Sequence, residues 1–154
     1  MKNLCETDKA YIAGLLDGEG CIGIDRIKSK NKTWEYDFRI RIVITNKDEN
    51  VICWLKCVTG IGCAYIHGGR YKENWNIIHR WQAVSEKARE FLLAVRPYLR
   101  IKKDVCDIVL TLPKLDSDRK FYGRTAAEYT EQFRCYQIAK TKNIRGRALT
   151  SQEI

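Results

Sequence analysis

The sequence predicts an α+β fold, in which two strand hairpins form an antiparallel sheet and helices cover one face of it. Apolar residues at helical spacing lead into a Gly-Glu-Gly step at 18–20. Residues 35–45 alternate apolar and polar side chains, which is typical of a strand with one buried face. Residues 88–95 again show helical spacing. These stretches predict the order helix, strand, strand, helix, strand, strand, helix, followed by C-terminal helices.

Cap and turn signals divide the chain into these elements. The residues expected to cap helices are Thr7, Asn46 with Glu49, Ser85, and Thr125 with Glu128. The expected elements are a helix over 7–18, strands over 21–28 and 35–45, a helix over 50–59, strands over 61–70 and 75–84, and helices over 85–96, 98–112 and 125–139, followed by a basic loop over 140–147. One domain is expected over 1–154, with its core at about 7–112 and a C-terminal helical extension and basic tail over about 113–154.

The charge of the chain predicts an anionic partner. The 28 Lys and Arg residues outnumber the 19 Asp and Glu residues, which gives a formal net charge of +9. Nucleic acid is the favoured partner, because no basic amphipathic helix and no apolar run long enough to cross a bilayer is evident. For that reason no membrane partner is expected. No Gly-rich phosphate loop or redox dithiol is evident, so no small-molecule cofactor is expected either.

The seven cysteines are scattered, and none forms a Cys-x-x-Cys pair. With only two histidines in the chain, a structural zinc site is not expected. Buried thiols in a reducing compartment are the favoured interpretation. Because the N-terminus also lacks a signal-peptide pattern, an intracellular location is expected.

The strand over 35–45 places Arg39 and Arg41 on its polar face. Two interpretations stay open, a solvated strand face and a nucleic-acid surface. In the strand over 75–84, Arg80 belongs to the set that looks more like a polar working face, and a β-bulge would reverse that assignment.

The first helix carries small residues beside its apolar stripe. Ala13, Gly14, Asp17 and Gly18 form a smooth strip. A glycine inside a helix costs about 1 kcal/mol relative to alanine, so Gly14 and Gly18 indicate that another element packs very close. The alternative is an ordinary buried helix that ends at a glycine cap.

Residues 12–20 (IAGLLDGEG) resemble the LAGLIDADG motif of homing endonucleases. Residues 45–47, 54–55 and 60–62 resemble the next segment of that family, and residues 96–103 resemble its segment with a basic active-site residue, so the similarity covers roughly 7–110. The resemblance implies the family's α-β-β-α-β-β-α fold with a curved antiparallel sheet. Because the chain has one motif, it also implies a homodimer that forms through Ala13, Gly14, Asp17 and Gly18 and binds a pseudo-palindromic site.

The same resemblance implies the catalytic residues. Glu19 would be the metal-binding acid, with the Gly18 carbonyl as a further ligand, and the hard oxygen donors suit Mg²⁺, with Mn²⁺ as the alternative. Lys102 matches the basic residue near the scissile phosphate, although it could also be one more solvated lysine. Asn46 stands where the family often has a water-positioning glutamine, and could equally be only a helix cap.

The uncovered sheet face is expected to read double-stranded DNA in the major groove, and basic residues are expected to contact phosphates. The candidates for base reading are Asp25, Asp37, Arg39, Arg41, His67, Arg70 and Arg80, and those for phosphate contact include Lys140, Lys142, Arg145 and Arg147. The favoured function is therefore a site-specific double-strand DNA endonuclease. An RNA-binding intron maturase on the same fold is the alternative, and a descendant that only binds DNA is less favoured because Glu19 and Lys102 are intact.

Overall fold

The structure is a computed structural model that describes residues 4–30, 33–67, 77–114 and 124–143. Its elements follow the predicted order of helices and strands, with one extra 3₁₀ turn. They are α1 (Glu6–Glu19), β1 (Gly20–Lys28), β2 (Tyr36–Asn46), α2 (Glu49–Thr59), β3 (Cys63–His67), β4 (Ile78–Val84), α3 (Ser85–Val95), η1 (Arg96–Tyr98), α4 (Lys103–Leu110) and α5 (Ala126–Lys142).

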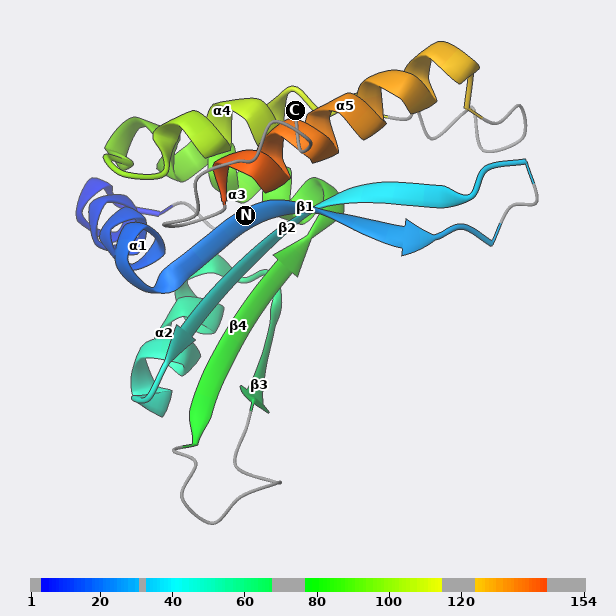
Figure 1. The fold of residues 1–154 in the computed structure, drawn as a ribbon. Coiled ribbons are helices and arrows are strands. Elements are labelled where there is room, and N and C mark those ends of the chain that lie inside the picture. The colour runs from blue at the N-terminus through cyan, green and yellow to red at the C-terminus, as the bar shows by residue number, and fades with distance from the viewer. Residues whose placement is uncertain (1–3, 31–32, 68–76, 115–123, 144–154) are drawn as a thin grey trace.

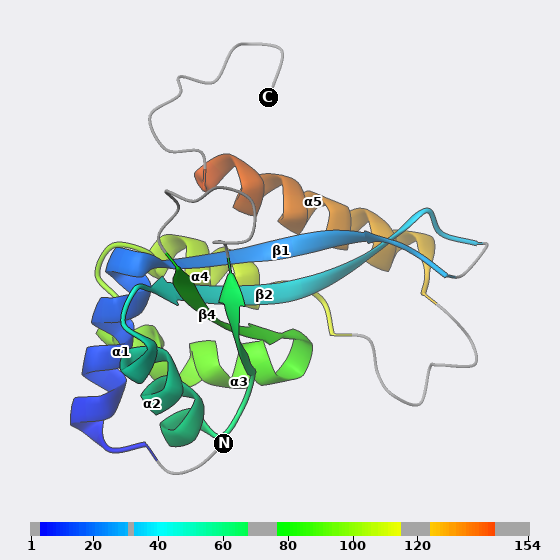
Figure 2. The same cartoon turned by 90° about the horizontal axis from the view of Figure 1, so that it is seen from below.

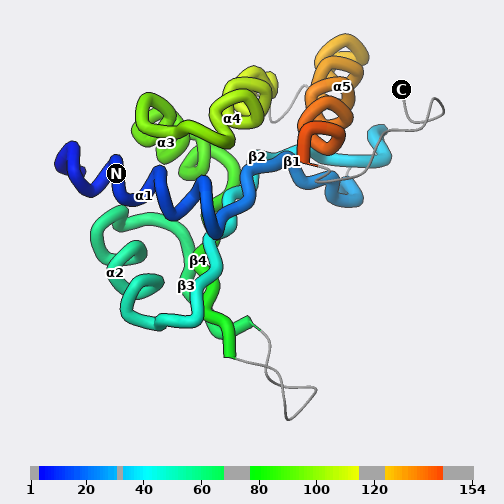
Figure 3. The backbone as a smooth tube through the Cα atoms, turned by 60° about the vertical axis from the view of Figure 1, so that its left-hand side comes forward, coloured from blue at the N-terminus to red at the C-terminus, as the bar shows by residue number. Residues whose placement is uncertain are grey.

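The four strands form one antiparallel sheet in the order β1-β2-β4-β3. The helices lie on one side of this sheet, and the described residues leave its other face uncovered (Figures 1 and 2). The α1 helix lies between α2 and α3 (Figure 3). The predicted α+β fold with helices on one face is therefore confirmed.

Strand alternation determines which side chains enter the core. Ile22 of β1, Ile42 of β2 and Ala83 of β4 lie opposite one another and are buried beneath the helices. Since neighbouring residues along a strand point to opposite faces, Arg41 of β2 lies on the uncovered face, as predicted. Trp81 is fully buried on the helix side of β4, so the predicted faces of that strand are also confirmed.

The core continues into α3 and α5. Phe91 packs on Trp81 with ring centroids 5.0 Å apart, and the predicted apolar stripe of α3 is buried throughout. The α5 helix covers the far end of the β1–β2 hairpin, where Trp34 stacks on Tyr129 with centroids 4.7 Å apart. The predicted capping box at Thr125 is present at the start of α5.

Three predicted caps are wrong. The Cys5 sulfur, rather than Thr7, accepts the first-turn N–H of α1. Asp48, rather than Asn46, caps α2. No side chain caps α3, because Ser85 has a φ of 55° and forms the turn from β4 into the helix.

The helix predicted over 98–112 is interrupted. A 3₁₀ turn that contains Pro97 is followed by an irregular segment at 99–102, and α4 begins only at Lys103. The backbone N–H groups of this segment bind a side chain of α1, as described below, so they are not available for helical hydrogen bonds.

The cysteines differ from the prediction in their exposure. All seven are unpaired, but only Cys106 and Cys135 are buried, so five thiols are accessible. Burial raises the pKa of Cys106 to about 12, and the nearby Asp107 charge adds to the shift, so this thiol stays protonated. None of the helices in the described segments is long and apolar enough for a membrane crossing.

Candidate functional site at the end of the motif helix

The candidate site lies where α1 ends and β1 begins. Glu19 is the last residue of α1 and is exposed. A Cβ atom at Gly20 would lie 2.7 Å from the carbonyl oxygen of Leu16, so only glycine allows this sharp turn into β1. Gly20 lies opposite Ile44, and the Thr45 hydroxyl donates to the Glu19 carbonyl over 3.5 Å. The backbone of Glu19 is therefore held beside the end of β2.

The last four carbonyl groups of a helix have no partner within it, and here their partners differ. The Leu16 carbonyl accepts from the N–H of Gly20, and the Asp17 carbonyl accepts from the Lys102 ammonium. The Glu19 carbonyl accepts from the Thr45 hydroxyl, and Gly18 between these residues is exposed. The carbonyl of an exposed glycine thus lies next to Glu19 in the chain.

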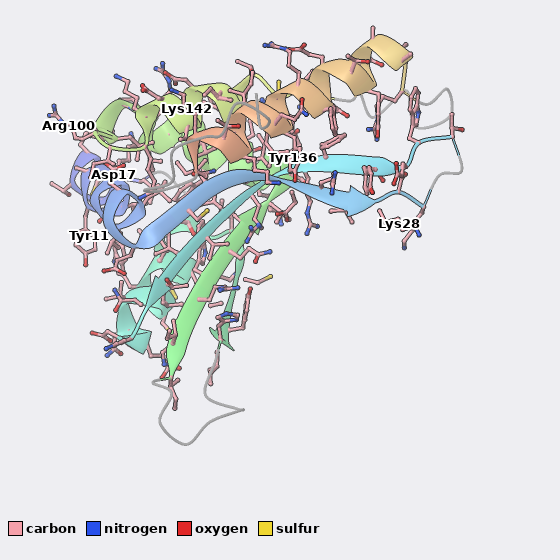
Figure 4. All side chains as sticks on the ribbon, viewed as in Figure 1. Tyr11, Asp17, Lys28, Arg100, Tyr136 and Lys142 are labelled. Atoms are coloured by element: carbon pink, nitrogen blue, oxygen red, sulfur yellow. The ribbon has the colours of Figure 1, made fainter. Side chains whose placement is uncertain are left out.

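The Asp17 carboxylate holds the segment 100–102 against the end of α1. One of its oxygens accepts the N–H of Arg100 over 2.7 Å and that of Ile101 over 3.1 Å, and the other accepts the N–H of Lys102 over 2.9 Å. Asp17 and Arg100 lie at the same end of the molecule (Figure 4). We call Asp17 and the segment 100–102 that it holds the Asp17 clamp. The Lys102 ammonium also binds the Asp17 carbonyl, so the side chain of Lys102 is held by the same residue.

The Asp17 clamp is buried, and the Asp17 carboxylate stays ionised within it. Asp17 and Lys102 are each only 7% exposed. Burial by itself would raise the pKa of the Asp17 carboxyl, but the backbone hydrogen bonds and the Lys102 charge outweigh it, so the pKa lies below its ordinary value. The positive charge of Lys102 lies at the C-terminal end of α1, where the helix dipole favours a cation.

The structure thus brings Lys102 to the end of α1, and its role near the scissile phosphate stays a prediction. Asn46 is also nearby, since it is the last residue of β2 and follows Thr45. Its side-chain oxygen accepts the N–H of Asp48 over 2.9 Å, so that oxygen is used in a local turn. A water-positioning role for Asn46 stays a prediction.

The predicted smooth strip of α1 is divided in two. Gly14 and Gly18 are exposed, and a Cβ atom on either would meet nothing within 4 Å. Ala13 and Asp17 are buried inside the chain, so Gly14 and Gly18 are the exposed part of the predicted strip, and the dimer contact itself stays a prediction. Tyr11 is 52% exposed on the same helix and is labelled in Figure 4.

On the uncovered sheet face, one carboxylate holds two arginines. Asp25 accepts from Nε of Arg41 over 2.6 Å and from an Nη of Arg39 over 3.4 Å. The two arginine side chains remain 37% and 39% exposed, whereas Asp25 is 22% exposed. Asp25 thus orients two cations, an arrangement that depends on strand register and that sequence reasoning did not predict.

The second predicted acid on this face is also engaged. Asp37 accepts from Arg124, whose buried guanidinium also donates to the Tyr36 carbonyl over 3.1 Å. In the other hairpin, Arg80 lies 6.0 Å from the ring of Tyr65, and His67 is exposed at the end of β3.

The predicted basic tail begins as helix. Lys140 and Lys142 are exposed in the last turn of α5, so a loop there is wrong. Arg70, Arg145 and Arg147 lie outside the described residues. Within the described segments of this one chain, no three His, Cys, Asp or Glu side chains come close enough to hold a metal ion.

Known proteins were compared with the chain by sequence and by fold. A search of curated proteins found no match. The structure resembles that of the homing endonuclease I-CvuI in complex with the I-CreI target, with a TM-score of 0.72 and 15% identity over 96% of this chain and 90% of that chain. It resembles the archaeal intron-encoded homing endonuclease I-Vdi141I complexed with DNA, with a TM-score of 0.71 and 14% identity over 95% of this chain and 90% of that one.

The LAGLIDADG homing endonuclease I-LtrWI bound to target DNA also matches, with a TM-score of 0.64 and 15% identity over 96% of this chain and 48% of that chain. At these identities the likeness shows a shared fold. The sequence model of the LAGLIDADG endonuclease family matches residues 12–104, which is more than half of the chain. On that match, the chain belongs to the LAGLIDADG endonuclease family.

Proposed function

We propose that the protein is a site-specific double-strand DNA endonuclease that acts as a homodimer and depends on a divalent metal ion. The arrangement at the end of α1 carries this proposal. Glu19, which is exposed, the neighbouring exposed Gly18 and the ammonium of Lys102, which binds the Asp17 carbonyl, all lie where α1 ends and the basic sheet begins.

The exposed side of α1 supports the homodimer. Because no described residue lies within 4 Å of a Cβ atom built at Gly14 or Gly18, a second copy of α1 could pack against both positions with close backbone contact. A twofold axis between the two helices would give an isologous interface and bring the two Glu19 carboxylates together. Exposed apolar groups such as Tyr11 and Ile101, 52% and 73% exposed, would extend the contact.

The oxygen donors fit a divalent cation. Two like-charged carboxylates repel at short distance, and a Mg²⁺ ion, or Mn²⁺ as the alternative, removes that cost through hard oxygen ligands. Glu19 and the Gly18 carbonyl would hold it. When bound, such an ion activates water and stabilises the charge on the phosphate and the leaving oxygen.

Lys102 would supply a fixed positive charge to the same site. Its backbone N–H and its ammonium are both bound by Asp17, so little freedom remains to be lost when DNA binds. A cation in this position stabilises negative charge that develops on a phosphate oxygen during hydrolysis.

The uncovered face would lie in the DNA major groove. Arg39 and Arg80 could donate to guanine there, and His67 could contact a neighbouring base. The exposed lysines of α5, Lys140 and Lys142, would contact the phosphate backbone and contribute affinity that depends on salt.

The most direct test of the proposal compares DNA binding and DNA cleavage by the variant Glu19→Gln with those of the wild-type protein. A DNA target is first selected from a randomised duplex library with the wild-type protein. We expect Glu19→Gln to bind that target with unchanged affinity and to cleave it about 100-fold more slowly or worse, because a neutral amide is a poor ligand for Mg²⁺.

Glu90→Gln, an exposed glutamate of α3 with no assigned role in the site, is the matched control and should cleave normally. Full cleavage by Glu19→Gln would overturn the assignment. Stimulated splicing of the parent intron without DNA cleavage would favour the maturase instead.

A further inference from the structure

An open groove of about 510 Å³ runs along the outer edge of β1, beside the last turns of α5. Strand β1 is an edge of the sheet, and α5 lies alongside it (Figure 2). The groove is lined by Gly23, Arg26, Arg41, Tyr136, Lys140 and Asn143, among others. None of the catalytic residues assigned above lines it.

Two features form the groove. The side-chain amide of Asn143 donates to the Ile22 carbonyl over 2.7 Å, which attaches the end of α5 to the free edge of β1. Gly23, the next residue, has no side chain, and a Cβ atom there would approach only the Asn143 amide, at 3.6 Å. The space between strand and helix therefore stays open.

The register of the sheet directs Arg41 toward this edge. Arg41 lies opposite Gly23, so its side chain meets no bulk on β1. The Nε of Arg41 donates to Asp25, and its side chain makes no other hydrogen bond to the described residues. Both Nη groups of a guanidinium held in this way are available to an acceptor in the groove.

Two further cations face the same space. Arg26 stacks 4.4 Å above the ring of Tyr36 and lies 5.6 Å from that of Tyr136, which fixes its guanidinium at the groove. Lys140 is exposed on α5. Asp25 is the only carboxylate among the described residues that line the groove. With three cations and one anion, the groove therefore carries a net positive charge.

The width of the sheet indicates what would occupy the groove. Strands about 4.8 Å apart give a four-stranded sheet a width of roughly 14 Å, whereas the DNA major groove is only about 12 Å wide. The central strands can then reach base edges, but an edge strand meets the wall of the groove, which is the sugar–phosphate backbone. A side chain that leans outward across β1 therefore reaches a phosphate before it reaches a base.

We propose that the β1 edge groove binds a phosphodiester of the DNA backbone, and that Arg41, together with Arg26 and Lys140, is a phosphate contact rather than a base reader. This inference rests on the proposed function, since it assumes DNA on the uncovered face. It changes the role of Arg41 from the base reading expected from sequence, and it leaves Arg39, on the same carboxylate, as a base-reading candidate.

Binding without cleavage tests the assignment. Affinity for the selected target is measured against salt concentration with divalent ions chelated, and base preference is measured by selection from a library. For Arg41→Gln and for Lys140→Gln we expect weaker binding to all sequences, a salt slope lower by about one per protomer, and an unchanged preferred sequence.

Arg41→Lys separates the two roles. A phosphate contact keeps its salt slope when lysine replaces arginine, whereas a bidentate guanine contact loses its base preference. Lys87→Gln, an exposed lysine of α3 on the helix side, is the control for charge alone and should leave the slope unchanged.

A changed base preference in Arg41→Lys, or an unchanged salt slope in both glutamine variants, would overturn the inference while leaving the endonuclease assignment intact. Failure of the wild-type protein to bind any duplex DNA would overturn both proposals.

Discussion

At the residue scale, Asp17 joins two distant parts of the chain. Its carboxylate accepts N–H groups 83 to 85 residues away, and its own carbonyl accepts the Lys102 ammonium. An acidic residue near the end of a helix is ordinarily unfavourable, because the helix dipole is negative there. The three donors and the buried ammonium compensate for this cost, so the residue acts by positioning Lys102.

Asp17→Asn should destabilise the protein by about 3 kcal/mol, because one amide oxygen cannot replace two carboxylate oxygens for three buried donors. The pKa of Asp17 is lowered in the folded protein, so its stabilising effect is present above about pH 4 and is lost as the pH falls through the folded-state value. Urea unfolding between pH 2.5 and pH 7 measures this difference.

The control is Asp104→Asn, an exposed carboxylate in the first turn of α4, which should cost well under 1 kcal/mol. A difference between wild type and Asp17→Asn that stays constant down to pH 2.5 would contradict the assigned role.

At the element scale, most helices and strands could be predicted because their signals are local. The alternation of β2 and the apolar stripe of α3 depend on neighbouring residues, and both are present as expected. The break at 99–102 was not predictable, because the competing hydrogen-bond acceptor is Asp17, which is distant in sequence. For the same reason, the resemblance to the LAGLIDADG family could indicate Glu19 and Lys102, but the pairing of Asp25 with Arg41 could not be predicted because it follows from strand register.

The α5 helix illustrates an element whose start is determined locally. The Thr125 hydroxyl accepts the N–H of Glu128, and the Glu128 side chain accepts the N–H of Thr125. We expect Thr125→Ala to cost about 1 kcal/mol, measured by thermal unfolding, because the N–H of Glu128 loses its acceptor and the Glu128 carboxylate loses the hydroxyl that donates to it.

Thr130→Ala is the matched comparison within α5. Thr130 is exposed and donates only to the Ala126 carbonyl over 3.0 Å, so alanine there should be neutral or slightly stabilising through its higher helix propensity. Equal effects of the two substitutions would argue against the capping box as the source of stability.

At the scale of the whole molecule, the exposed glycines of α1 make assembly testable. Gly14→Leu should leave the single chain folded, since nothing lies within 4 Å of a Cβ atom at this position. It should convert the proposed dimer into a monomer, because two backbones could no longer approach closely. Light scattering after size-exclusion chromatography measures the mass, and circular dichroism reports the fold.

Ala127→Leu, an exposed alanine in the first turn of α5, adds the same side chain elsewhere and should leave the mass unchanged. A wild-type protein that is monomeric at micromolar concentration both with and without DNA would contradict the homodimer.

The clamp between Asp17 and the segment 100–102 also has a consequence for biosynthesis. The motif helix leaves the ribosome early, whereas the donors that neutralise Asp17 and the ammonium that caps its carbonyl are made more than eighty residues later. A nascent fragment that ends before residue 100 carries Glu19 without these partners. The candidate catalytic centre is therefore completed only after β4 and α3 have been translated, so the chain cannot assemble it before most of the core that supports it exists.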